Sequence, residues 1–88
     1  MTDIKFIEIV KQTIADYFNK RKDATDKNGD ITPADVFIVW QCKALQNWKA
    51  LASTTVSDGM YYEVTLNGDK NELDLDAYKK WENRRIEL

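Results

Sequence analysis

The chain has 88 residues, which is enough for one domain and too few for two, so we expect a single small domain over residues 1–88. Its composition is globular, with 43% hydrophobic and 32% charged residues, and a net charge of −2 argues against generic binding to DNA or anionic membranes. The longest strongly apolar run, VFIVW, is far shorter than the roughly 20 residues that a membrane span needs.

The numbers of cysteine and histidine residues indicate the expected cellular compartment and limit the catalytic chemistry that we expect. Cys42 is the single cysteine, so an internal disulfide is excluded and a reducing cytoplasm is the natural location. The chain contains no histidine, the commonest general base and metal ligand at neutral pH. We therefore expect a protein that is not an enzyme, with no cofactor and no catalytic or metal-binding residue.

The first predicted element is an amphipathic helix over residues 3 to about 21. Thr2 suits the N-cap position, and basic residues close the helix, where cations complement its dipole. Apolar side chains recur at three- and four-residue steps, the period of one helical face. They are Ile4, Ile7, Val10, Ile14 and Phe18.

The segment DKNGDITPAD follows and resembles the start of an EF-hand calcium loop. Asp26, Asn28 and Asp30 alternate as the first three calcium ligands of such a loop do. The sixth position, which an EF-hand fills with Gly, is Ile31, and the twelfth, which it fills with Glu, is Phe37. We therefore do not expect specific calcium binding.

A loop followed by a second helix explains the same segment better. Thr32 is a suitable N-cap, Pro33 suits the first helical position, and Asp35 can complete a capping-box-like exchange. The next residues, VFIVWQC, are apolar nearly all round, which predicts a central helix from Pro33 to about Gln46. Residues 48–55 are compatible with a helical extension or a strand, and the following Thr and Val residues favour the strand.

The remaining residues predict a hairpin and a last helix. Residues 60–66 alternate between apolar and mixed side chains, as a half-buried strand does, and residues 72–76 alternate again. The loop at residues 67–71 contains the turn pair Asn-Gly. From about Asp76 the pattern returns to helix. The chain as a whole predicts an α+β fold with two N-terminal helices, a two- to three-stranded antiparallel β-meander and a C-terminal helix.

Candidate interaction residues come from aromatic side chains and their neighbours on this pattern. If Met60, Tyr62, Val64 and Leu66 face the core, the opposite strand face carries Tyr61, Glu63 and Thr65. Exposed aromatic residues on a sheet mark protein interfaces or sites where single-stranded bases stack. The plainer alternatives to an interaction site are structural. Tyr61 is then covered by the last helix or by a long side chain, and Trp48 lies in the core. The candidates are Trp48, Tyr61, Glu63, Thr65 and Trp81.

Two further features are weaker candidates for a metal site and for a reactive residue. Asp74 and Asp76 are predicted to share one strand face, where two carboxylates can hold Mg²⁺ together with phosphates, although they more often form a solvated face. Cys42 lies in the most apolar part of the chain, where free cysteines are usually inert packing.

Residues 36–83 resemble a family of small proteins of unknown function encoded by phages and prophages of Gram-positive bacteria. The similar features are a VW-CK-LQN-KAL-ST core, a DGMYYEVT-NGDKNE hairpin and the LDAYKK that follows it. The resemblance implies an origin in a phage or prophage and a bacterial cytoplasm, and it implies no activity or site residue. Residues 1–25 lie outside the resemblance.

These observations favour a non-enzymatic interaction domain that binds and modulates a host or phage protein. We also expect a homodimer with Trp48 or Trp81 near the contact, because the aromatic side chains exceed what one small domain buries. The alternative function is an accessory single-stranded nucleic-acid-binding protein, which is not favoured. It would use Tyr61 together with the basic residues Lys49, Lys79, Lys80, Arg84 and Arg85.

Overall fold

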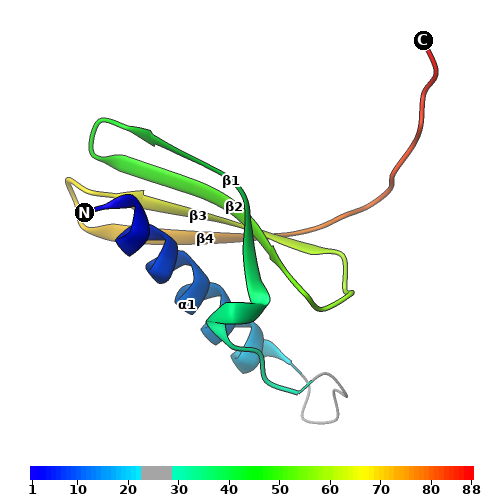
Figure 1. The fold of residues 1–88 in the computed structure, drawn as a ribbon, viewed down its shortest axis with the longest axis horizontal. Coiled ribbons are helices and arrows are strands. Elements are labelled where there is room, and N and C mark those ends of the chain that lie inside the picture. Colours follow the sequence, from blue (N-terminus) through cyan, green and yellow to red (C-terminus); the bar gives the residue numbers. More distant parts are fainter. Residues whose placement is uncertain (23–28) are drawn as a thin grey trace.

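The computed structural model describes residues 1–22 and 29–88, and it has one helix packed on one face of a four-stranded sheet (Figure 1). The sheet is an antiparallel meander with the strand order β1-β2-β3-β4. The fold is therefore α+β, but the predicted arrangement of two N-terminal helices, a shorter meander and a C-terminal helix is wrong. The elements are α1 (Asp3–Arg21), the 3₁₀ turn η1 (Pro33–Asp35), β1 (Val36–Ala44), β2 (Asn47–Thr54), β3 (Met60–Asn67) and β4 (Glu72–Lys79).

Helix α1 agrees with the predicted helix over residues 3–21. Its N-cap is Thr2, whose hydroxyl oxygen accepts a hydrogen bond of 3.1 Å from the Lys5 N–H. The buried face is rotated from the predicted one, because Ile4 is 73% exposed. The residues that α1 buries are Phe6, Val10, Ile14, Ala15 and Phe18.

The predicted second helix from Pro33 to Gln46 is wrong. The capping box at Thr32 is present, and the Asp35 carboxylate accepts a hydrogen bond of 2.8 Å from the Thr32 N–H. It starts only the single turn η1, after which the chain becomes β1. A run that is apolar on all sides fits a strand as well as a buried helix, and its branched and aromatic residues favour the strand.

The structure confirms the strands that were predicted after residue 47 and the loop between β3 and β4. Residues 48–55 are mostly strand, as favoured, and the strands at 60–66 and 72–76 are confirmed within β3 and β4. The loop after β3 approaches the β1–β2 turn closely, and the Gly68 N–H donates a hydrogen bond of 3.0 Å to the Gln46 carbonyl. A Cβ atom at Gly68 would collide with that carbonyl oxygen, so this position requires glycine.

The predicted C-terminal helix is also wrong. Strand β4 continues to Lys79, because it pairs with the whole of β3 from Met60↔Lys79 to Asn67↔Glu72. Residues 80–88 form neither helix nor strand and leave the body of the molecule (Figure 1). Cross-strand pairing over eight residues outweighs the helical propensity of the charged residues that follow Asp76.

The core lies between α1 and the sheet face that it covers. The rings of Phe6 and Trp48 are 5.3 Å apart, and Val64 on β3 is fully buried. Tyr17 on α1 meets Tyr62 on β3 edge to face at 5.8 Å. Burial, and secondarily the carboxylate of Asp58, raise the pKa of the Tyr62 hydroxyl above its ordinary value.

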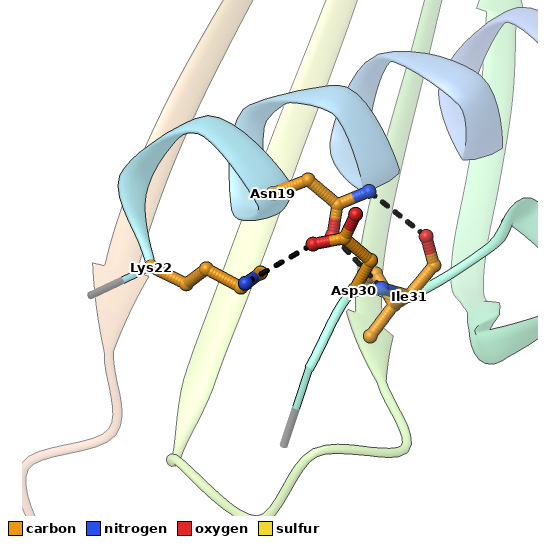
Figure 2. Close-up of polar contacts among 4 residues, drawn as sticks. All are labelled: Asn19, Lys22, Asp30 and Ile31. Atoms are coloured by element: carbon orange, nitrogen blue, oxygen red, sulfur yellow. Dashed lines mark hydrogen bonds and ion pairs between the residues drawn. The ribbon is translucent and has the colours of Figure 1, made fainter. Parts of the chain in front are cut away.

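A side-chain clamp ties the end of α1 to the chain that enters η1 (Figure 2). The Asn19 amide nitrogen donates to the Ile31 carbonyl at 2.9 Å, and its oxygen accepts from the Ile31 N–H at 2.8 Å. Lys22 and Asp30 form an ion pair at 3.1 Å beside it. Asp30 therefore has a structural partner, whereas Asp26 and Asn28, the other residues with the spacing of EF-hand ligands, lie outside the described residues.

Candidate interaction surface

The sheet has a second face, which α1 does not cover, and we call it the outer face. Its residues follow from the register, because directly paired residues in an antiparallel sheet share a face. One line across the four strands runs Phe37↔Ser53↔Tyr61↔Tyr78, and we call it the aromatic row. The outer face is thus built from alternate residues of the same strands whose other residues form the core.

A β-bulge at Val39 brings Trp40 to this face. The pairing shifts between Ile38↔Ala52 and Trp40↔Leu51, so one additional residue of β1 lies between them. Trp40 is 43% exposed, and Phe37 and Tyr78 are 48% and 52% exposed. The bulge therefore places Trp40 beside the aromatic row, and together they form an apolar end of the outer face.

The rest of the outer face is mainly acidic. Glu63 on β3 lies directly opposite Asp76 on β4, and Asp74 lies opposite Thr65. Lys49 on β2 forms an ion pair with Glu63 at 3.3 Å. Like charges that face each other across strands destabilise a sheet, so the Glu63–Asp76 pair lowers the stability of the fold.

The structure brings together three of the five candidate interaction residues. Tyr61, Glu63 and Thr65 lie side by side on the outer face, as expected. Trp48 lies on the opposite face, 6% exposed and packed against α1, which is the plainer alternative considered for it. Trp81 lies in the C-terminal segment and is 95% exposed.

The aromatic residues of β1 were missed as candidates because the sequence pattern assigned them to a helix. Phe37 and Trp40 are two positions of the run VFIVWQC, which a central helix would have buried on all sides. The signal that could have identified them is the composition of the run, since valine, isoleucine and aromatic residues are enriched in strands.

Chemically reactive side chains are sparse on this surface. Cys42 was expected to pack in the core, but it is exposed on β1 as a free thiol. Asp74 and Asp76 share the outer face, as predicted, but within residues 1–22 and 29–88 no three metal-ligating side chains gather where they could hold an ion.

Two grooves mark the surface. One, of about 360 Å³, lies at the polar end of the outer face and is lined in part by Cys42, Lys49, Thr65 and Asp74. The other, of about 580 Å³, lies between α1 and η1 and is lined by Ile4, Ile7, Glu8, Lys11, Gln12, Pro33 and Ala34. Neither contains a nucleophile beside a general base.

The fold and this surface define a small α+β domain with one covered and one open sheet face. The chain belongs to the family of unknown function DUF6275, whose family model matches residues 7–88. That match includes most of α1, so the family extends beyond residues 36–83, where the sequence resemblance lies. Comparisons with curated proteins and with solved structures find no match. Among the described residues, no helix is both long enough and apolar enough to cross a membrane.

Proposed function

We propose that the chain is a non-enzymatic interaction domain and that the outer face binds a segment of another protein with apolar and basic side chains. The observation that carries the proposal is the combination of the aromatic row and Trp40 with the carboxylates of Glu63, Asp74 and Asp76 on one face. Exposed aromatic side chains supply contact area at low entropic cost, and the carboxylates favour a basic partner.

The stability of the fold supports the same assignment. Phe37 and Tyr78 are about half exposed, and Asp76 faces a like charge, Glu63, so replacing Phe37 or Tyr78 with a polar residue, or Asp76 with a neutral one, is expected to cost the fold little stability. Features that burden a fold without stabilising it are commonly kept for binding. The resemblance to phage and prophage proteins suggests a host or phage protein in the bacterial cytoplasm as the partner.

The test uses protein capture together with variants of the outer face. The wild-type chain, Phe37→Ser and Ile4→Ser are immobilised in parallel and exposed to host lysate, and captured proteins are identified by mass spectrometry. Both variants replace an exposed apolar residue, but Ile4 lies on α1, away from the outer face. We expect a captured protein that Phe37→Ser loses and Ile4→Ser retains. Equal capture by all three chains would contradict the proposal.

A peptide titration tests the chemistry of the partner. Amide shifts of Tyr61 and Thr65 are followed while a peptide of alternating Leu and Lys, or one of alternating Leu and Glu, is added. We expect the basic peptide to shift them and the acidic peptide to have little effect, since the neighbouring carboxylates repel it. A preference for the acidic peptide would contradict the proposed partner.

The alternative function, binding of single-stranded nucleic acid, has weaker support. Lys49, one of its basic residues, is already paired with Glu63, and the carboxylates beside Tyr61 would repel phosphates. The other basic residues lie at the end of β4 and in the C-terminal segment. A titration with fluorescent oligonucleotides distinguishes the two functions, since binding that weakens steeply with salt would favour this alternative.

A further inference from the structure

Strand β4 has an open edge on the side away from β3. The Lys80 N–H donates a hydrogen bond of 2.7 Å to the Gly59 carbonyl, which fixes the direction of the backbone groups. Because these groups alternate along a strand, the even-numbered residues of β4 bond to β3, and the odd-numbered ones direct their N–H and C=O groups outward. Within the described part of the chain, no strand lies on that side.

The two edges of the sheet differ in regularity. The edge formed by β1 is interrupted by the bulge at Val39, a feature that prevents regular pairing with another strand. Strand β4 pairs with β3 without a shift in register over its full length, from Glu72 to Lys79. It is therefore the edge that can accept a further strand.

Charge is divided unequally along β4 and the segment that follows it. Residues 72–76 carry the carboxylates of Glu72, Asp74 and Asp76. Residues 77–85 carry Lys79, Lys80, Arg84 and Arg85, with Glu82 the one acidic residue among them. A charged edge of one sign repels its own copies and deters pairing. An edge divided into an acidic and a basic half is complementary to itself when the strand is reversed.

We propose that β4 pairs antiparallel with β4 of a second copy of the chain, with Tyr78 opposite its symmetry mate and with residues 80–84, which follow β4, extending the strand in the pair. In this register Asp76 faces the partner's Lys80, and Glu72 faces the partner's Arg84, each contact occurring twice. On the other face, Trp81 meets the partner's Leu75, which covers an indole that is 95% exposed in the single chain. A two-fold contact of this kind needs only one self-complementary patch.

The neighbouring registers are less favourable. Those that keep the outer faces on one side are centred on single residues, and centring on Asp76 or on Lys79 opposes two like charges at the axis. Centring on Ala77 leaves one kind of oppositely charged contact, Asp74 with the partner's Lys80, and opposes Glu72 to the partner's Glu82. The register centred on Tyr78 instead opposes two aromatic rings, and its one like-charged contact is Asp74 with the partner's Glu82. The outer faces of both copies then lie on the same side of a continuous sheet of two meanders, so the outer face remains open to another partner.

The first test measures mass and removes an outward backbone donor. Light scattering of the full chain at tens of micromolar is expected to give twice the 10.3 kDa of the single chain. In Ala77→Pro the lost N–H points outward, so the ladder to β3 is preserved while two hydrogen bonds of the dimer are removed. We expect its dimer dissociation constant to rise more than tenfold with an unchanged circular dichroism spectrum.

The second test exchanges charges across the proposed contact. Lys80→Glu is expected to weaken the dimer roughly tenfold, and adding Asp76→Lys to the same chain is expected to restore it. Lys80 directly follows β4, and its backbone continues the extended pairing through the hydrogen bond to the Gly59 carbonyl, so it lies four extended residues from Asp76 and rescue requires an intermolecular contact. Lys70→Glu, the same charge change in the β3–β4 loop, serves as the control and is expected to have little effect.

Three results would overturn the proposal. One is a mass that stays near that of a single chain at every concentration. Another is a dimer that tolerates both Ala77→Pro and Lys80→Glu but is lost in Trp40→Ser, which would assign the contact to the outer face. The third is a failure of the double variant to restore the dimer that Lys80→Glu weakens. A dimer through the outer face would compete with a partner for that face, whereas the other two results leave partner binding by the outer face untouched, and Phe37→Ser tests that binding separately.

Discussion

The two faces of the sheet use the same four strands and differ in nearly every other respect. On the covered face, side chains such as Val64 are fully buried under α1 and packed against Phe6 and Trp48. On the outer face, Phe37 remains about half exposed. Strand alternation alone divides the residues between the faces, so it is the helix that makes one face a core. The aromatic residues of the other face have no such helix over them within residues 1–22 and 29–88.

Charge separates the two faces as clearly as burial does. The covered face places apolar partners opposite each other, for example Val64 and Leu75. The outer face places Glu63 opposite Asp76, and among the residues that the structure describes it pairs Glu63, but not Asp76, with a cation, Lys49. A face selected for stability alone would not oppose two carboxylates. The comparison therefore assigns stability to the covered face, and it supports the proposal that the outer face serves recognition.

The largest expected effect compares one phenylalanine from each face. Phe6→Ala should reduce the free energy of unfolding by about 3–5 kcal/mol, because it empties a fully buried position. Phe37→Ala should cost less than about 1 kcal/mol, since the side chain is 48% exposed. Urea denaturation followed by circular dichroism measures both. Similar losses for the two variants would show that Phe37 is covered in solution and would break the comparison.

The next effect concerns the clamp that holds α1 in place over the covered face. Asn19→Ala removes two hydrogen bonds to the Ile31 backbone and leaves partly buried groups unpaired, so we expect a loss of about 1–3 kcal/mol. Gln12→Ala on the same helix is the control, because its amide bonds only to exposed Asp16 and should cost less than about 0.5 kcal/mol. Equal effects in urea denaturation would mean that the clamp does not position the helix.

The sequence predicted the elements whose period is unambiguous. Helix α1 has an N-cap at Thr2 and apolar residues at helical spacing, and β3 alternates regularly from Met60 to Leu66. For the outer face this was sufficient to place Tyr61, Glu63 and Thr65 together. The same alternation could not show whether α1 or another element covers the opposite side.

The errors arose where local signals conflict with pairing partners far along the chain. The capping box at Thr32 is real, yet it begins only η1, because the next residues pair with β2 and extend the sheet. Residues after Asp76 favour a helix by composition, yet β3 provides a full-length partner that draws them into β4. The aromatic row crosses all four strands, so it could not be recognised before the register of each pair was known.

A pH effect tests the interior of the covered face. The pKa of Tyr62 is raised from 10.0 by burial and by Asp58, so the unfolded chain loses this proton first as pH rises. The stability that this raised pKa of Tyr62 contributes to the fold is fully present below about pH 10, and it is lost as pH rises through the folded-state pKa. Between about pH 9 and about pH 11, the urea midpoint of wild type should therefore fall more steeply than that of Tyr62→Phe. Parallel curves would contradict the assignment.

The smallest expected effect is a gain in stability on the outer face. Asp76→Thr removes the repulsion from Glu63, and Asp74→Thr is the matched control, because it is the same change on the same strand face opposite a neutral residue, Thr65. Any benefit from the strand propensity of threonine is common to both, so the difference between them isolates the repulsion. We expect Asp76→Thr to be more stable than Asp74→Thr by about 0.5 kcal/mol.

Urea denaturation at low micromolar protein and low salt measures this difference without a contribution from self-association. Raising the salt concentration should reduce it, since the two carboxylates are partly exposed to screening ions. A difference of zero at low salt would show that Lys49 already neutralises Glu63. The opposed carboxylates would then carry no cost, and the case that the outer face gives up stability for recognition would rest on its exposed aromatic residues alone.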